Sequence, residues 1–204
     1  MQFESNHIYH IYNRGNNSQT IFFNRENYLF FLKKIKEYIL PYADILAWCL
    51  MPNHFHLMVY MNCIEIESRE QVSKDKFLIH KRSINDSIAI LLRSYTSAIN
   101  NEQDRTGSLF QHRTKSVCLT EINGVSPAWF QTKYGAIINI IDPEKEYPLV
   151  CFNYIHQNPV KARLVSRIGD WEFSSYRDIV GMRNGKLINR KRINEFGLKI
   201  VEEY

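Results

Sequence analysis

The 204-residue chain has few of the features that mark secreted or membrane-spanning proteins. It contains only four cysteines, at positions Cys49, Cys63, Cys118 and Cys151. They stand singly in apolar surroundings, which favours reduced thiols over a disulfide framework. No apolar run reaches the roughly 18 residues of a membrane span, and the first residues lack a basic segment followed by an apolar one. We therefore expect neither a membrane span nor a signal peptide, and a cytoplasmic location.

Positive charge is concentrated near the C-terminal end. The whole chain has a formal net charge of +5 and a hydrophobic content of 45%, which supports a globular fold. The segment 159–192 holds nine basic and three acidic residues, so it alone carries a larger positive charge than the whole chain. A basic segment of this kind suits a phosphate backbone, although a merely solvated tail is the alternative.

Two histidines flank one apolar residue in the sequence Asn53-His54-Phe55-His56-Leu57. Alternate side chains of a β-strand point to the same side, so His54 and His56 are expected on one face while Phe55 contributes to the core. Such a pair is half of a divalent-metal site, but it does not identify the ion. Alternating histidines also occur as ordinary polar positions of half-buried strands. A structural zinc site that includes Cys49 and Cys63 is a further, less favoured interpretation.

A second polar group lies about a hundred residues later, where Tyr154 and Asn158 stand four positions apart. On a helix these positions share one face, and Pro159 is expected to end or bend that helix. Two imidazoles, one amide oxygen and one phenol form a coherent set of three metal ligands and a nucleophile for phosphoryl transfer.

The hydrophobic periodicity predicts an α+β fold with the order β-α-β-β-α-β. This order is that of a ferredoxin-like split βαβ fold, with an antiparallel sheet, helices on one face, a C-terminal helix that brings Tyr154 to the open face, and a basic tail. The expected elements are a strand at 7–13, a helix capped by Asn24 or Asn27 and ending before Pro41, strands at 43–50 and 53–61, a loop at 68–81, a helix at 84–100, a strand at 109–120 and a helix at 149–157.

Five segments in one order, between about residues 7 and 178, give the chain a family resemblance. They are YHIYNRGNN from Tyr9, WCLMPNHFHL from Trp48, RTGSLFQHR from Arg105, YIHQNPVKA from Tyr154 and WEFSSY from Trp171. The chain resembles the HUH single-tyrosine transposases, in the REP-associated branch of the IS200-like family. It departs from the family in a longer segment at 121–150 and in His112, which stands where a small residue is more common.

The resemblance implies a nuclease and strand transferase that acts on single-stranded, hairpin-bearing DNA. His54, His56 and Asn158 would hold Mg²⁺ or Mn²⁺. Tyr154 would attack the scissile phosphate, giving a 5′-phosphotyrosine and a free 3′-hydroxyl. The catalytic domain would span 1–160, and 161–204 would form a basic extension that packs on the domain and on DNA. The sequence leaves open whether the protein is a monomer or a homodimer.

Further polar residues are candidates for DNA contacts. Arg14, Asn16 and Asn17 form a polar turn that suits phosphate or an unpaired base, although turn chemistry alone also explains them. The remaining candidates lie on the 109–120 strand or in the basic extension: Gln111, Arg113, Lys161, Arg163, Arg190, Lys191 and Arg192.

Two other functions fit the same fold. One is a domesticated module that binds hairpin or single-stranded nucleic acid without cleaving it. The other is an RNA-binding ferredoxin-like protein, which the absence of that module's aromatic strand signature disfavours. The presence of the two histidines, the tyrosine and the asparagine favours the enzyme.

Overall fold

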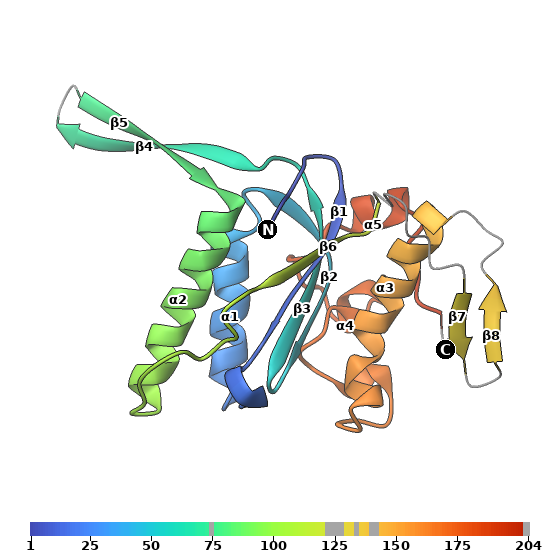
Figure 1. Ribbon diagram of the computed structural model, residues 1–204. Helices are drawn as coiled ribbons and strands as arrows, with labels where there is room; N and C mark the ends of the chain where they lie inside the picture. The colour runs from blue at the N-terminus through green and yellow to red at the C-terminus, as the bar shows by residue number, and fades with distance from the viewer. Residues whose placement is uncertain (74–75, 121–128, 133–134, 139–142, 202–204) are drawn as a thin grey trace.

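A four-stranded antiparallel sheet forms the centre of the computed structural model, which describes residues 1–73, 76–120, 129–132, 135–138 and 143–201. The sheet order is β2-β3-β1-β6 (Figure 1), with β1 at Ile8–Arg14, β2 at Ala43–Met51, β3 at His54–Met61 and β6 at Lys115–Cys118. β3 pairs antiparallel with both β1 and β2, which confirms the predicted hairpin and places the two histidines on an inner strand. The split βαβ fold predicted from the sequence is therefore correct.

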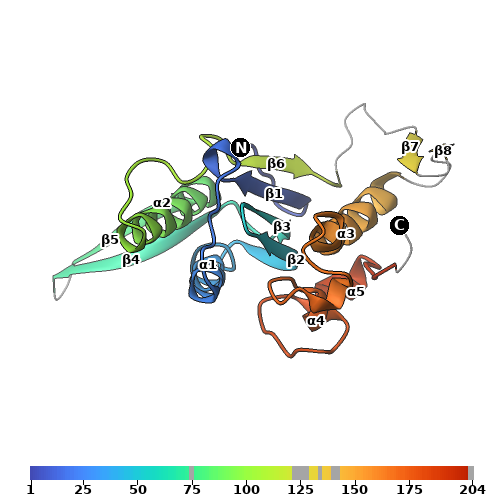
Figure 2. The ribbon, with the colours of Figure 1, turned by 90° about the horizontal axis from the view of Figure 1, so that it is seen from below.

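Helices cover both faces of this sheet. α1 (Arg25–Tyr38) and α2 (Ile84–Glu102) pack side by side on one face, and α3 (Pro143–Lys161) packs on β2 and β3 from the other (Figure 2). The side chain of Asn24 caps α1, and Ser83 and Asp86 form a capping box at the start of α2, so local hydrogen bonds fix where both helices begin. As expected, α3 brings Tyr154 to the face that α1 and α2 leave open.

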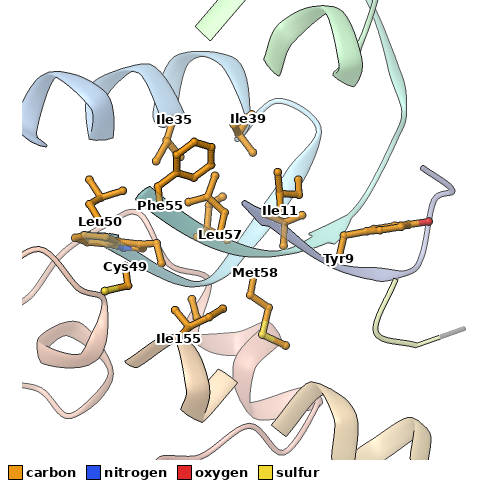
Figure 3. Close-up of a cluster of buried hydrophobic side chains, with 14 of the residues drawn as sticks. Tyr9, Ile11, Ile35, Ile39, Cys49, Leu50, Phe55, Leu57, Met58 and Ile155 are labelled. Carbon is orange, nitrogen blue, oxygen red and sulfur yellow. The ribbon is translucent and has the colours of Figure 1, made fainter. Parts of the chain in front are cut away.

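The alternation of β3 divides its side chains between two apolar layers. Phe55 and Leu57 point toward Ile35 of α1, whereas Met58 points toward Ile155 of α3 (Figure 3). Because alternate residues of a strand share a face, the even-numbered positions of β3, including both histidines, lie on the α3 side. The sheet thus separates the apolar layer under α1 from the α3 side, which carries both an apolar contact with α3 and the polar site.

The predicted loop at 68–81 is wrong. The chain forms a β-hairpin there, with β4 at Glu65–Ser73 and β5 at Lys76–Ser83, and the hairpin projects far from the body of the molecule (Figure 1). A ribbon that stands away from the core needs no apolar face, so hydrophobic alternation does not reveal it. Backbone pairing between the two strands defines it instead.

Two predicted boundaries also differ from the structure. The strand expected at 109–120 is regular only in β6, because the residues before it are held by single contacts: an isolated bridge joins Gly15 to Phe110, and Gln111 N donates to Arg14 O. α3 is longer at both ends than expected and continues past Pro159. That proline removes one hydrogen bond in the last turn, and the helix still closes with Ala162 N donating to Asn158 O.

The long segment at 121–150 contains another hairpin, β7 (Trp129–Thr132) with β8 (Gly135–Ile138), and the start of α3. Residues 121–128, 133–134 and 139–142 of this segment lie outside the described residues.

The C-terminal extension packs along β2, the edge strand of the sheet. Isolated bridges join Cys49 to Ser174 and Ile45 to Ile188, and Leu50 N donates to Phe173 O. Its short helices are η2 (Ile168–Asp170), α4 (Tyr176–Ile179) and α5 (Arg190–Glu195), and a further 3-10 turn, η1, spans Asn16–Ser18 near the start of the chain. The extension covers an edge that would otherwise expose unpaired backbone groups. Across the part of the chain that the structure describes, no helix is both long and apolar enough to span a membrane.

Candidate active site

A cavity of about 630 Å³ lies where α3 faces the sheet at the His54 end of β3. It brings together all four residues that the sequence predicted for metal binding and nucleophilic attack. The lining residues are Tyr12, Asn13, Arg14, His54, Phe55, His56, Gln111, Arg113, Lys115, Tyr154, Asn158, Lys161 and Ala162. Four of them are basic and none is acidic, so the cavity attracts anions.

The hydrogen bond of His54 fixes its tautomer. Its Nδ1 lies 2.6 Å from Oδ1 of Asn53, which can only accept, so Nδ1 carries the proton. The lone pair of the neutral ring is then on Nε2. This is the atom that a cation would bind.

His56 is held by a histidine on the neighbouring strand. Its Nδ1 lies 2.8 Å from Nε2 of His10, and both side chains are buried. Nε2 of His56 is buried and has no hydrogen-bond partner among the described residues. When Nδ1 of His56 donates to His10, the free Nε2 holds a lone pair, so the pair orients His56 as an outer-shell partner orients a metal ligand.

His10 is the residue that sequence reasoning undervalued. The sequence assigns it no role, because its position near His56 depends on the pairing of β1 with β3. His10 and Tyr12 are two positions apart on β1 and therefore share one face of the strand, and Tyr12 pairs with His56 on β3. Strand alternation therefore indicates that His10 lies on the same side of the sheet as His56. The sequence did not reveal that β1 and β3 are neighbours in the sheet.

Asn158 also has its donor occupied. Its Nδ2 donates to the carbonyl of Tyr154 at 3.1 Å, which leaves the amide oxygen as the free end of the side chain. Tyr154 itself is 40% exposed, and its ring centroid lies 5.6 Å from that of His56. Nζ of Lys161 lies 5.7 Å from the centroid of the Tyr154 ring, so a positive charge accompanies the phenol. Helical spacing therefore places the phenol and the amide at one cavity, as predicted.

Burial and neighbouring positive charge keep the histidines of the site neutral. Burial, and then the charge of Arg14, lower the pKa of His54 to about 4. Burial lowers the pKa of His56 further, with added contributions from His10, His54 and Arg14, and burial lowers the pKa of His10 to about 4. Neutral imidazole is the form that binds metal.

The residues present fit a divalent cation. His54 and His56 each have Nδ1 engaged, and Asn158 has its amide nitrogen engaged, so three lone-pair atoms remain for one ion. Among the described residues, no group of three or more His, Cys, Asp or Glu side chains is arranged as a metal site, and the amide oxygen of Asn158 would be the third protein ligand of a cation held here. Cys49 is fully buried in β2, and Cys63 donates to the carbonyl of Pro41. Neither thiol lines the cavity.

His156 is a buried residue that links three segments of the chain. Its side chain is buried, with Nδ1 at 2.7 Å from the carbonyl of Phe152 and Nε2 at 2.8 Å from Oγ of Ser175. Ser175 Oγ also accepts from the backbone N–H of Trp48 at 2.9 Å. The histidine therefore ties α3 to the C-terminal extension and to β2, and it faces away from the cavity because it lies two positions from Tyr154 on the helix.

The candidate DNA-contact residues divide into two groups. Those that line the cavity are Arg14, Gln111, Arg113 and Lys161, together with Lys115, which the sequence analysis did not single out. Those that lie outside it are Asn16, Asn17, Arg163, Arg190, Lys191 and Arg192.

Arg192 lies at the opposite end of β3 from His54. It pairs with Asp44 and Glu195, and its guanidinium lies 4.2 Å from the ring centroid of Tyr60. Lys191 pairs with Glu195 as well. The basic cluster at 190–192 thus packs against the far end of the sheet, and the cavity has its own set of basic residues.

Comparison with known proteins supports the architecture. No family model matches the chain, and no curated protein matches it significantly in sequence. A solved structure, that of a REP-associated tyrosine transposase bound to a REP hairpin, has a similar fold, with a TM-score of 0.53 and 17% identity over 89% of this chain and 83% of that chain. At this identity the likeness establishes the fold, and the chain therefore has the fold of a tyrosine transposase.

Proposed function

We propose that the protein is a metal-dependent endonuclease and strand transferase that acts on single-stranded DNA with hairpins. The observation that carries the proposal is that His54, His56 and Asn158, each with one side-chain nitrogen engaged in a hydrogen bond, line the same cavity as Tyr154. A protein that only binds nucleic acid does not require two histidines and an asparagine with one nitrogen hydrogen-bonded and another atom left to accept. The structurally similar transposase is bound to a hairpin, which supports the same class of partner.

Mg²⁺ or Mn²⁺ is the cation that we propose for this site. When bound, it would polarise the scissile phosphate and stabilise the negative charge that develops on its oxygens. The three protein ligands are neutral, and four basic side chains line the same cavity. A divalent cation alone is repelled there, so we expect it to bind more tightly when DNA supplies the negative charge of a phosphate.

Tyr154 is the proposed nucleophile. Its oxygen forms a bond to phosphorus while the bond from phosphorus to the 3′-oxygen breaks, so the strand is left with a 5′-phosphotyrosine and a 3′-hydroxyl. The proton that the phenol loses is balanced by the one that the 3′-oxygen gains. Because one phosphodiester replaces another, the 3′-hydroxyl of the same or another strand can reverse the step without an external energy source.

The basic residues of the cavity serve the substrate. Arg14, Arg113, Lys115 and Lys161 surround the site from β1, the 109–114 segment, β6 and α3. Their charges suit the phosphates on either side of the scissile bond. Gln111 and Asn13 add amide groups that suit base edges.

Cleavage of labelled hairpin DNA with single-stranded flanks tests the proposal. We expect nicked product with a free 3′-hydroxyl in Mn²⁺ and none in EDTA. His54→Ala and His56→Ala should each abolish nicking, while His7→Ala, which removes a half-buried histidine outside the cavity, should not. Hairpin binding without cleavage, across hairpins from the genomic neighbourhood of the gene, would favour the binding module instead.

A further inference from the structure

A second and larger cavity, of about 1240 Å³, lies between α2 and the segment 105–114. It shares Asn13, Gln111 and Arg113 with the candidate active site, so the two cavities are neighbours. The shared residues stand between them at the end of β1. A DNA strand that passes these residues on leaving the active-site cavity reaches the second cavity.

The walls of this second cavity are held in place. Nδ2 of Asn100, on α2, donates to the carbonyl of Gly107 at 2.9 Å, which ties the segment to the helix. Nδ2 of Asn13 donates to Gln111 O and to Thr114 Oγ1, at 3.2 and 3.0 Å, which ties the segment to β1. Gly107 has a φ of +86°, a conformation that suits glycine where the segment turns. The cavity is thus preformed, which lowers the entropic cost of binding a ligand.

The chemistry of the lining suits a phosphodiester backbone. Arg93, Arg105 and Arg113 line it together with amide and hydroxyl side chains, and the lining contains no aspartate or glutamate. Arg93 and Arg113 are exposed and form no ion pair with a described carboxylate. Arginine, amide and hydroxyl groups are the usual partners of phosphate and sugar. Of the two aromatic rings in the lining, Phe110 is buried and His112 is exposed, so stacking of bases is limited to one imidazole.

We propose that this cavity holds the backbone of a single DNA strand where the strand leaves the active site. The inference rests on the proposed function, because it takes the cavity at Tyr154 as the place of cleavage. It assigns Arg93 and Arg105, on α2 and on the turn that follows it, to phosphate contacts remote from the reacting atoms. Binding in the second cavity then lengthens the contact with the flank and adds little sequence preference.

DNA binding by the Tyr154→Phe protein tests this inference without requiring cleavage. Anisotropy titrations would use a labelled hairpin with a short single-stranded flank, the same hairpin with the flank lengthened on either side, and the blunt hairpin. The variants are Arg93→Gln alone and Arg93→Gln with Arg105→Gln. Arg105 also donates to Oε1 of Gln19, so its replacement removes a hydrogen bond within the protein. The Arg93→Gln variant keeps that hydrogen bond and therefore reports on phosphate binding without a change in the local fold. Lys33→Gln with Lys36→Gln, two exposed α1 residues that line neither cavity, removes the same charge as the double variant.

We expect the Arg93 variants to bind the long-flank DNA more weakly. The slope of log affinity against log salt concentration should become shallower by about 0.7 for each phosphate that the variant no longer binds. Their affinity for the short-flank DNA should match that of the Lys33 and Lys36 control.

Two results would overturn the inference. If the Arg93 variants and the control lose the same affinity for the long-flank DNA, net charge alone explains the loss. If the Arg93 variants bind the blunt hairpin more weakly than the control does, the cavity holds the duplex stem instead of a single strand. The proposed function fails separately, if the unmutated protein binds these DNAs but does not nick them.

Discussion

His10 and His56 meet across two neighbouring strands, and when Nδ1 of His56 donates to His10 the lone pair of His56 is on Nε2. Residues that orient a metal ligand contribute to affinity although they do not touch the metal. His54 depends in the same way on Asn53, and Asn158 on the backbone of Tyr154. At the scale of single residues, the hydrogen bonds that each polar side chain already makes determine which of its atoms remain to bind a cation.

Removal of the His10 acceptor should weaken metal binding. We expect His10→Leu to lower the affinity for Mn²⁺, measured calorimetrically in the presence of hairpin DNA, by about 10- to 100-fold, because Nδ1 of His56 loses its partner. His10→Gln keeps a side-chain oxygen that can accept from His56 and should retain more of the affinity. If His10→Leu binds Mn²⁺ as tightly as the unmutated protein, His10 does not position the ligand.

The residues of the site were predictable to different degrees. Strand alternation predicted that His54 and His56 share a face, and helical spacing predicted the same of Tyr154 and Asn158, because both rules act within one element; the family resemblance supplied their proposed roles. The role of His10 depends on strand order, and the burial of His156 depends on where the C-terminal extension packs. No local rule supplies either.

At the scale of elements, α3 carries the proposed nucleophile and is anchored through His156. Oγ of Ser175, which is fully buried, donates to Nε2 of His156, whose Nδ1 donates to the carbonyl of Phe152, and it accepts from the N–H of Trp48. Three segments that are far apart in the sequence thus share one hydroxyl group.

Loss of that hydroxyl should destabilise the fold. We expect Ser175→Ala to lower the free energy of unfolding by about 1–3 kcal/mol, since it leaves buried polar groups of His156 and Trp48 without a partner. Urea unfolding measures the change. Ser166→Ala, at an exposed position, should change the stability little. Equal stabilities of the two variants would contradict the anchoring role.

Elements with a face in the core were predicted well, and elements without one were not. β1, β2, β3, α1 and α2 follow from apolar periodicity, and the start of α1 follows from the cap at Asn24. The β4–β5 hairpin projects from the body, and the residues before β6 follow the end of β1 irregularly. Their backbone partners, which the sequence pattern does not encode locally, decide their conformation.

At the scale of the whole molecule, buried histidines link stability to pH. Burial lowers the pKa of both His10 and His156 from 6.5 to about 4. In the unfolded chain these rings gain protons as the pH falls through about 6.5, whereas in the folded protein they stay neutral until about pH 4. The unfolded state binds more protons in this window, so stability is retained above pH 6.5 and is lost as the pH falls toward 4.

Urea unfolding in EDTA should therefore show a midpoint that decreases between about pH 7 and about pH 5. The carboxylates with lowered pKa, such as Asp86 and Glu37, titrate below this range and do not explain the decrease. His156→Gln, which removes one of the titrating groups, should weaken the dependence on pH. A midpoint that is constant across the range would contradict the neutral, buried state of these histidines.

The pair of neighbouring cavities, at the candidate active site and at α2, also belongs to this scale. Their walls include β1, the 105–114 segment and α2, so no single stretch of sequence contains them.

The most direct test of the account is the covalent intermediate. Protein incubated with labelled hairpin DNA and Mn²⁺ should give a protein–DNA species that resists denaturant, and Tyr154→Phe should abolish it while DNA binding stays nearly unchanged, because only one hydroxyl is removed. Tyr147→Phe, on the same helix but outside the cavity, is the matched control and should keep the adduct. An adduct that persists in Tyr154→Phe would contradict the account, and Tyr12, the other tyrosine that lines the cavity, would then be the residue to replace next.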